Sequence, residues 1–153
     1  HIVFKDNNLP LILNIIYHAA AARSLIAEPW LLVNRYIKVP IIQQQQSQQA
    51  HRPVLAAANL ATDALRAVGA MHAALGLLAA LALKERHIRA ERSALLILTL
   101  ASLGQTWAHG RAYWTNSKYS LRALQEVGSL DSLVFVVSSI ALVKTVRRTG
   151  RLL

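Results

Sequence analysis

The stretch Glu91–Trp114, ERSALLILTLASLGQTWAHGRAYW, is long enough and apolar enough to cross a lipid bilayer as a helix. At about 100° per residue, Ser102, Gln105 and His109 fall on one side of that helix, while the other sides carry mainly Leu, Ile and Ala. A membrane helix with one polar stripe needs partners that cover the stripe. We therefore expect the rest of the chain to supply helices that pack against this side.

The composition of the chain indicates the same environment. Of its 153 residues, 54% are hydrophobic and 16% are charged, against roughly a quarter charged in a soluble domain. The 17 Lys and Arg outnumber the 7 Asp and Glu, giving a net charge of +10. The bases cluster at the ends of apolar runs, as membrane topology favours, so anionic lipid head groups are the expected partners. A basic nucleic-acid-binding protein is the less favoured alternative, because such proteins usually gather their bases in a patch on a soluble fold.

Three apolar segments in the C-terminal region 53–153 predict transmembrane helices. Their bounds are 53–83, 93–114 and 123–143, followed by a basic tail. Gly69, Ala73 and Gly76 lie on one side of the first segment, where small side chains let another helix approach closely. Asp63 and Arg66 stand three residues apart, a spacing that lets them pair.

The N-terminal segment 1–42 is a second apolar region. Residues 9–27 form a fourth candidate span, weakened by His18 because an ionisable group in lipid is costly unless it is paired. Residues 30–38 carry a Trp, a Tyr and two bases, which favours a helix lying in the membrane interface. The Gln-rich stretch 43–52 is the expected linker. The predicted fold is therefore an all-α integral membrane up-down helical bundle with three to four transmembrane helices.

Charge predicts the orientation of this bundle. The turn at 84–92 and the C-terminal tail lie on the same side of an up-down bundle. Together they hold eight bases: Lys84, Arg86, Arg89, Arg92, Lys144, Arg147, Arg148 and Arg151. The opposite loop, 111–122, holds only three. The positive-inside rule then puts the turn and the tail on the cytoplasmic or matrix side.

Counting residues from the centres of the two predicted turns places polar side chains from three helices at two depths. The first level contains His72, Gln105 and Asp131. The second level, nearer the interface, contains Arg66, His109 and Glu126. One interpretation is structural, with the side chains of the first level hydrogen-bonding one another and fixing the register of the bundle.

The other interpretation is functional. In it, His72, Gln105, His109 and Asp131 line a cavity for a lipid, quinone, sterol or small amphiphile, or carry out acid–base catalysis. These four residues are the candidate site, and the sequence leaves both interpretations open.

Several other kinds of chemistry find no support in the sequence. The chain has no Cys, which excludes disulfides and thiolate catalysis. His72 and His109 differ in depth by about five residues, or ~7 Å, so a shared haem is not expected. There is no HExxH motif and no His pair at i, i+4, and no metal site is predicted. No other cofactor is expected, although a bound lipid is compatible with the pattern, and the absence of a strong catalytic motif argues against an enzyme.

Three stretches carry a resemblance to a known family: RAVGAMHAALGLLAALAL, LTLASLGQTWAHGRAYW and VGSLDSLVFVVSSIAL, between Leu65 and Val143. In topology and composition this part resembles the small DoxX-like four-helix membrane proteins. The layout is also similar to that of the four-span scaffolds that tether sterol-synthesis enzymes in the endoplasmic reticulum. The resemblance covers about half the chain and rests on no specific motif, so it transfers no catalytic residues.

Size, basic ends and small-residue helix faces together favour a small accessory or scaffold subunit of a larger membrane protein complex, with other membrane subunits as partners. The alternative from another class is a membrane-embedded enzyme or a lipid-, quinone- or sterol-binding protein with a polar site between its helices. The Ala-, Leu- and Arg-rich composition fits the mitochondrial inner membrane and the endoplasmic reticulum about equally.

Overall fold

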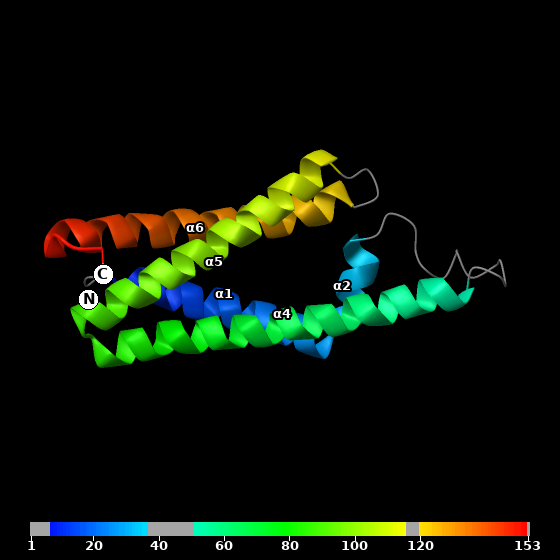
Figure 1. The fold of residues 1–153 in the computed structure, drawn as a ribbon, viewed down its shortest axis with the longest axis horizontal. Coiled ribbons are helices and arrows are strands. Elements are labelled where there is room, and N and C mark those ends of the chain that lie inside the picture. The colour runs from blue at the N-terminus through cyan, green and yellow to red at the C-terminus, as the bar shows by residue number, and fades with distance from the viewer. Residues whose placement is uncertain (1–6, 37–50, 116–119, 153) are drawn as a thin grey trace.

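The computed structural model describes residues 7–36, 51–115 and 120–152, and in these residues the chain is a bundle of helices without β-strands. Four long helices run alternately in opposite directions, and one short helix lies across one end of the bundle (Figure 1). The long helices are α1 (Asn8–Ala27), α4 (His51–Glu85), α5 (Ile88–Thr115) and α6 (Leu121–Thr149), and the short one is α2 (Pro29–Tyr36). The predicted all-α up-down bundle is therefore confirmed.

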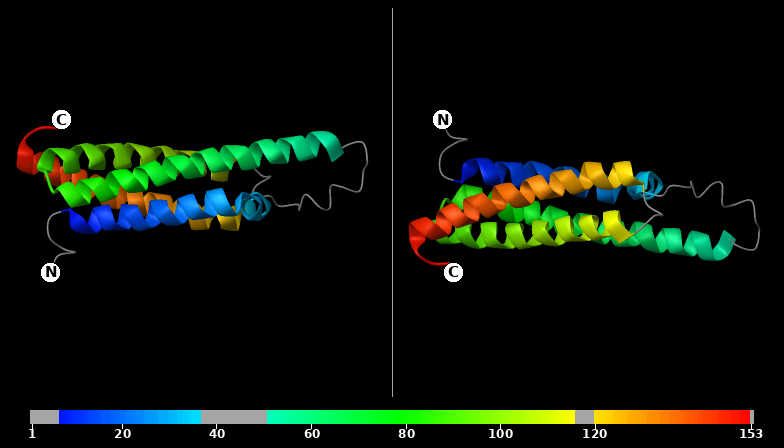
Figure 2. Two further views of the ribbon diagram at one scale, coloured as in Figure 1. Left: turned by 90° about the horizontal axis from the view of Figure 1, so that it is seen from below. Right: turned by 90° about the horizontal axis from the view of Figure 1, so that it is seen from above.

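The bundle consists of two helix pairs. Helix α1 packs most extensively against α4, and α5 packs most extensively against α6, whereas the contacts between the pairs are fewer. Figure 2 shows the α1–α4 pair lying along the α5–α6 pair in both views. The starts of α1 and α5 and the ends of α4 and α6 lie together at one end (Figure 1). We call this the basic end, because it carries the eight bases of the 84–92 turn and the C-terminal segment.

Close packing of α1 on α4 depends on glycine. A Cβ atom at Gly69 would lie 2.7 Å from Cγ1 of Ile26, and one at Gly76 would lie 3.4 Å from the Cβ of His18. Both glycines face α1, as their spacing predicted. Ala73 is exposed instead, because the contact line with α1 runs along the other side of the two glycines, where His72 is buried.

Large apolar side chains cover the outside of the bundle, and polar side chains lie inside it beside an apolar core that includes Leu11, Leu95 and Leu98. Large apolar residues are exposed on the outside, among them Leu60, Trp107 and Trp114 at 73%, 71% and 82% exposure. The interior holds fully buried polar residues such as Asn14 and Ser138. Soluble monomers rarely expose large contiguous apolar surfaces, and in lipid it is the polar groups that turn inward. The fold is that of an integral membrane protein.

Among the described residues, three helices are long and apolar enough to cross a membrane: α1, α4 from Leu55 onward, and α6. Helix α1, the fourth candidate in the sequence, belongs to this set. Helix α5, which was predicted to span at 93–114, is 28 residues long but does not belong to it. The polar side chains of its stripe, including Gln105 and His109, lower its hydropathy.

Several predicted helix bounds were too short. Helix α5 begins at Ile88 rather than 93, and α6 ends at Thr149 rather than 143. Lys, Arg and Glu are good helix formers, so the helices continue into the charged flanks. Gly150, with a φ of 68°, ends α6 in the left-handed conformation that glycine adopts most readily. The predicted 84–92 turn is reduced to Arg86 and His87, which lie between α4 and α5.

The N-terminal predictions are only partly covered by the structure. The helix predicted at 30–38 is α2, which ends at Tyr36 and contacts α1, α4 and α6. The Gln-rich linker predicted at 43–52 lies outside the described residues except for its last two positions, which are helical because α4 begins at His51.

Candidate functional site

Six polar side chains meet between the two helix pairs, about midway along α1. We call them the central polar cluster. Its members are Tyr17 and His18 from α1, His72 from α4, Gln105 and His109 from α5, and Asp131 from α6. The four residues predicted as a candidate site, His72, Gln105, His109 and Asp131, are therefore brought together, and α1 adds two more.

Two histidines and an amide form one side of the cluster. The Nδ1 atoms of His18 and His72 are 2.9 Å apart, and Nε2 of His72 is 3.0 Å from Nε2 of Gln105. When the Gln105 amide donates to His72, His72 carries its proton on Nδ1 and donates it to His18. His18 then carries its own proton on Nε2. Turning the Gln105 amide by 180° reverses these roles, so one amide determines the tautomers of both histidines.

Asp131 is the centre of the other side. Its Oδ1 accepts a short hydrogen bond from the Tyr17 hydroxyl, and its Oδ2 lies 2.6 Å from Nδ1 of His109. The same Nδ1 is 3.0 Å from the backbone oxygen of Gln105, and Oδ2 accepts no hydrogen bond of good angle within the described part of the chain. The His109–Asp131 contact is therefore an ion pair when His109 is protonated. Asp131 is 1% exposed, so the hydroxyl of Tyr17 and the ring of His109 shield its carboxylate from solvent.

The two sides are joined at Gln105 and Tyr17. The Tyr17 hydroxyl lies 3.5 Å from Oε1 of Gln105, and its ring stacks edge-on against both His18 and His72. The cluster thus connects all four long helices. It does so at the interface between the helix pairs, where the contacts between helices are fewest.

The second predicted level is not assembled. Arg66 pairs with Asp63 at 3.1 Å on the exposed side of α4, which confirms the pairing predicted from their spacing. Glu126 is exposed and pairs with Arg35 of α2 and with Arg122. His109 belongs to the central polar cluster instead.

The end of α2 lies close to the start of α6, the helix that carries Glu126. The backbone oxygen of Tyr36 accepts a hydrogen bond of 2.8 Å from the Ser120 amide. Burial and the nearby Asp131 carboxylate raise the pKa of the Tyr36 hydroxyl to about 12. Tyr36 therefore stays protonated at neutral pH.

Further polar contacts lie between the cluster and the basic end. The side-chain amide of Asn14 donates to the hydroxyl of Ser138 at 2.9 Å. The amide of Asn7 donates to Glu91 at 3.0 Å and to Thr145 at 2.8 Å. These hydrogen bonds link α1 to α6, and the residue before α1 to both α5 and α6, at two further levels along the bundle.

Two buried polar atoms on α1 have no partner within the described residues: Oδ1 of Asn14 and Nε2 of His18. Both side chains are fully buried. They stand four residues apart and so share one face of the helix. A buried polar atom without a partner is costly, so a small polar molecule held between them would be stabilised.

The cluster does not resemble a metal centre. Nδ1 of His18 and of His72, which could ligate a metal, face each other in a hydrogen bond. The described part of the chain contains no group of three or more His, Asp or Glu placed to hold a metal ion.

Comparison with known proteins leaves the chain without an assigned family. No family model matches it, and no curated protein or solved structure is significantly similar to it. The resemblance to DoxX-like bundles stays a prediction.

The hydrogen bond between His18 and His72 can be tested by a double-mutant cycle. We expect His18→Leu and His72→Leu to destabilise the protein less in combination than the sum of the single effects, with a coupling free energy of about 1 kcal/mol. Unfolding in mixed detergent micelles measures the three variants against the wild type. Additive effects would show that the two rings do not stabilise each other.

Proposed function

We propose that this protein is an accessory or scaffold subunit of a larger membrane protein complex. The observation that supports this most directly is that the central polar cluster is largely satisfied within the chain. Each of its six side chains takes another member as a partner. Three hollows of the described part lie elsewhere, near Ile140, Arg35 and Ile88, and none of them is lined by a cluster residue. Such an interior holds a bundle together and does not require a substrate.

The length of α4 supports the proposal that this helix carries a contact surface for partner subunits. Its first turns extend beyond the ends of the other helices in all views (Figures 1 and 2). In the first three turns of α4, Leu55 and Leu60 are exposed, together with Ala56 and Ala57. Small residues allow close helix–helix approach in membranes. A neighbouring subunit that packs on this part of α4 would cover apolar surface that the chain itself leaves open.

The positive-inside rule suggests the orientation of the subunit. The basic end would face the cytoplasm or the matrix, and the α4 extension would face the opposite side. The mitochondrial inner membrane and the endoplasmic reticulum both fit this arrangement.

One observation favours a second candidate function, a lipid-, quinone- or sterol-binding protein. The unpartnered atoms of Asn14 and His18 are buried beside the central polar cluster. A small molecule with a hydroxyl or carbonyl group could bind both. In that case the protein would run alone after gentle purification and carry a bound small molecule.

The proposal is tested by gentle extraction of the native protein followed by mass measurement of the intact particle. We expect stoichiometric partner subunits in the particle. We also expect Leu60→Lys to release them while leaving the melting temperature of the isolated chain unchanged, because Leu60 is 73% exposed. A protein that runs alone would contradict the proposal.

The matched control is Leu152→Lys. Leu152 is also exposed, at 53%, but lies near the basic end. It receives the same new charge, and we expect the partners to be retained. Equal loss of partners from both variants would show that the α4 extension is not the contact surface.

A further inference from the structure

The basic end contains a buried guanidinium group that no carboxylate of the described residues neutralises. Arg92, near the start of α5, is 6% exposed. Its Nη1 donates to the hydroxyl of Thr149 at 3.1 Å and to the backbone oxygen of Arg151 at 3.3 Å. Both acceptors are uncharged, and Nε has no partner among the described residues. The adjacent carboxylate of Glu91 accepts a hydrogen bond from Asn7.

A buried cation in this state is unstable unless an anion approaches it. Taking a charge out of water is unfavourable, and an opposite charge with good geometry compensates for it. Within the described part of the chain, no carboxylate lies in ion-pair distance of Arg92. An anionic ligand would supply this counter-charge.

The surroundings of Arg92 can accommodate such a ligand. A groove of about 560 Å³ is lined by Ile88, Arg89, Arg92, Thr149 and Arg151. Three guanidinium groups thus line one hollow, together with a hydroxyl and one apolar side chain. Guanidinium groups match the oxygens of a phosphate and bind them through pairs of hydrogen bonds.

The position of the groove indicates what carries the phosphate. It lies where α5 begins and α6 ends, at the basic end of a bundle whose sides are apolar. In a membrane this is the level of the lipid head groups. We propose that this groove binds the phosphate of an anionic phospholipid, with Arg92 as the buried anchor and with Arg89 and Arg151 at the mouth. The inference requires the membrane location and does not depend on the role as an accessory subunit.

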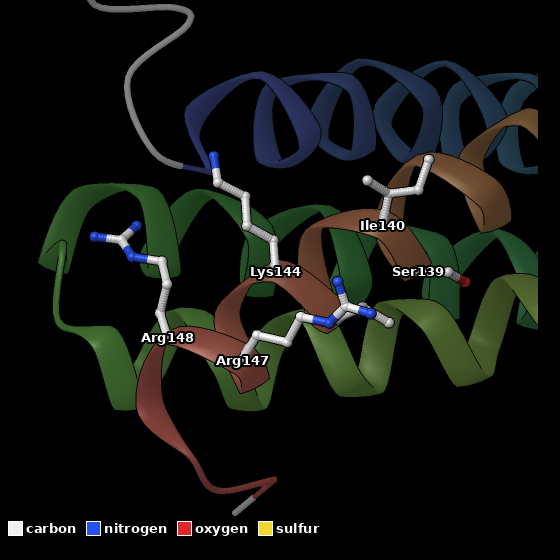
Figure 3. A pocket seen from close by; sticks show the side chains of 6 residues that line it. Ser139, Ile140, Lys144, Arg147 and Arg148 are labelled. Atoms are coloured by element: carbon white, nitrogen blue, oxygen red, sulfur yellow. The ribbon is translucent and has the colours of Figure 1, made fainter.

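A neighbouring groove provides an internal comparison. It lies on the outer face of α6 and is lined by Ser139, Ile140, Val143, Lys144, Arg147 and Arg148 (Figure 3). Lys144 and Arg147 are exposed, and all the lining residues come from one helix. This surface attracts anionic lipids in general, but it has no buried cation. Removing two charges here or two at the Arg92 groove changes the net charge equally.

The test uses the whole purified protein in lipid nanodiscs of phosphatidylcholine with or without phosphatidylglycerol. The readouts are phosphatidylglycerol retained after transfer to detergent, measured by native mass spectrometry, and the melting temperature. We expect the wild type to retain phosphatidylglycerol and to melt at a higher temperature with it. The double variant Arg89→Gln/Arg151→Gln should weaken retention about tenfold, because two guanidinium groups that would make charge-assisted hydrogen bonds to the phosphate are lost. These side chains line the mouth, and the backbone oxygen that accepts from Arg92 is unchanged.

The control variant Lys144→Gln/Arg147→Gln should weaken retention about twofold or less, since only general attraction is lost. Equal losses in the two double variants would overturn the proposal, because they would show attraction by net charge alone. Inorganic phosphate at millimolar concentration should raise the melting temperature less than phosphatidylglycerol does. An equal effect would overturn the assignment to a lipid and indicate a free phosphate site.

Discussion

Replacing Gly69 with leucine is expected to lower the free energy of unfolding by about 3 kcal/mol, because the α1–α4 contact leaves no room for a side chain there. Even a single added Cβ would lie 2.7 Å from Cγ1 of Ile26 and 2.9 Å from the Cβ of Leu25. These atoms belong to α1 near its C-terminal end, so the larger side chain must push the two helices apart. Unfolding in detergent, followed by circular dichroism, measures the change.

Gly104→Leu is the matched control for this prediction. A Cβ at Gly104 would meet no atom within 4 Å, and leucine is favoured over glycine in a helix by up to about 1 kcal/mol. We expect this variant to be as stable as the wild type or slightly more stable. Similar destabilisation at the two positions would show that loss of glycine itself, rather than the α1–α4 contact, is responsible.

Replacing Asp131 with alanine is expected to lower the free energy of unfolding by about 3 kcal/mol, the cost of removing one partner from a buried charged contact. The change leaves the Tyr17 hydroxyl with only the more distant Gln105 oxygen as an acceptor and His109 without its neighbouring carboxylate. Both side chains lie between the helix pairs, so we also expect the pairs to separate more readily. Cross-linking between α1 and α6 at increasing detergent concentration measures this separation.

Tyr17→Phe separates the two contributions of Asp131. It removes one hydrogen bond and keeps the ring that stacks on His18 and His72. Interhelical hydrogen bonds in membrane proteins contribute about 1 kcal/mol, so this variant should be clearly more stable than Asp131→Ala. If the two variants were equally stable, the His109–Asp131 contact would contribute nothing.

Much of the fold could be predicted because apolar run length is a strong signal in membranes. The helices and their alternating directions follow from the apolar segments and the short connections. The sequence predicts α5 as a span and α1 only as a fourth candidate, whereas α1 is apolar enough to cross a membrane and α5 falls short. His18 was counted against α1 as an unpaired ionisable group, but His72 hydrogen-bonds to it. The length and apolar faces of α5 predict a spanning helix, although its polar stripe lowers the hydropathy of that helix.

The depth count located most of the central polar cluster but placed His109 a turn away from Asp131. The reason lies in the direction of helical side chains, which point toward the N-terminus of their own helix. Helices α5 and α6 run in opposite directions (Figure 1), so these two side chains lean toward each other. Nδ1 of His109 and Oδ2 of Asp131 therefore come within 2.6 Å, although the two residues differ in backbone depth by about one turn. A count of residues gives the backbone depth and not the direction of the side chain.

Tyr17 and His18 were not predicted as cluster members. The depth of a residue can be counted only from a nearby turn, and the long segment after α1 offers no such reference. The signal that could have identified them is their position as an adjacent Tyr–His pair inside the apolar run of 9–27. An ionisable residue in a spanning helix calls for a partner on another helix.

The division into two helix pairs has a consequence for the order in which the chain is made. Helices α1 and α4 leave the ribosome before α5 and α6, so the first hairpin can enter the membrane and form its His18–His72 hydrogen bond while the second is still being synthesised. Its polar face then remains open to lipid until Gln105 and Asp131 arrive. Insertion during synthesis would therefore pass through a stage at which α1 and α4 are paired and their polar face still awaits α5 and α6.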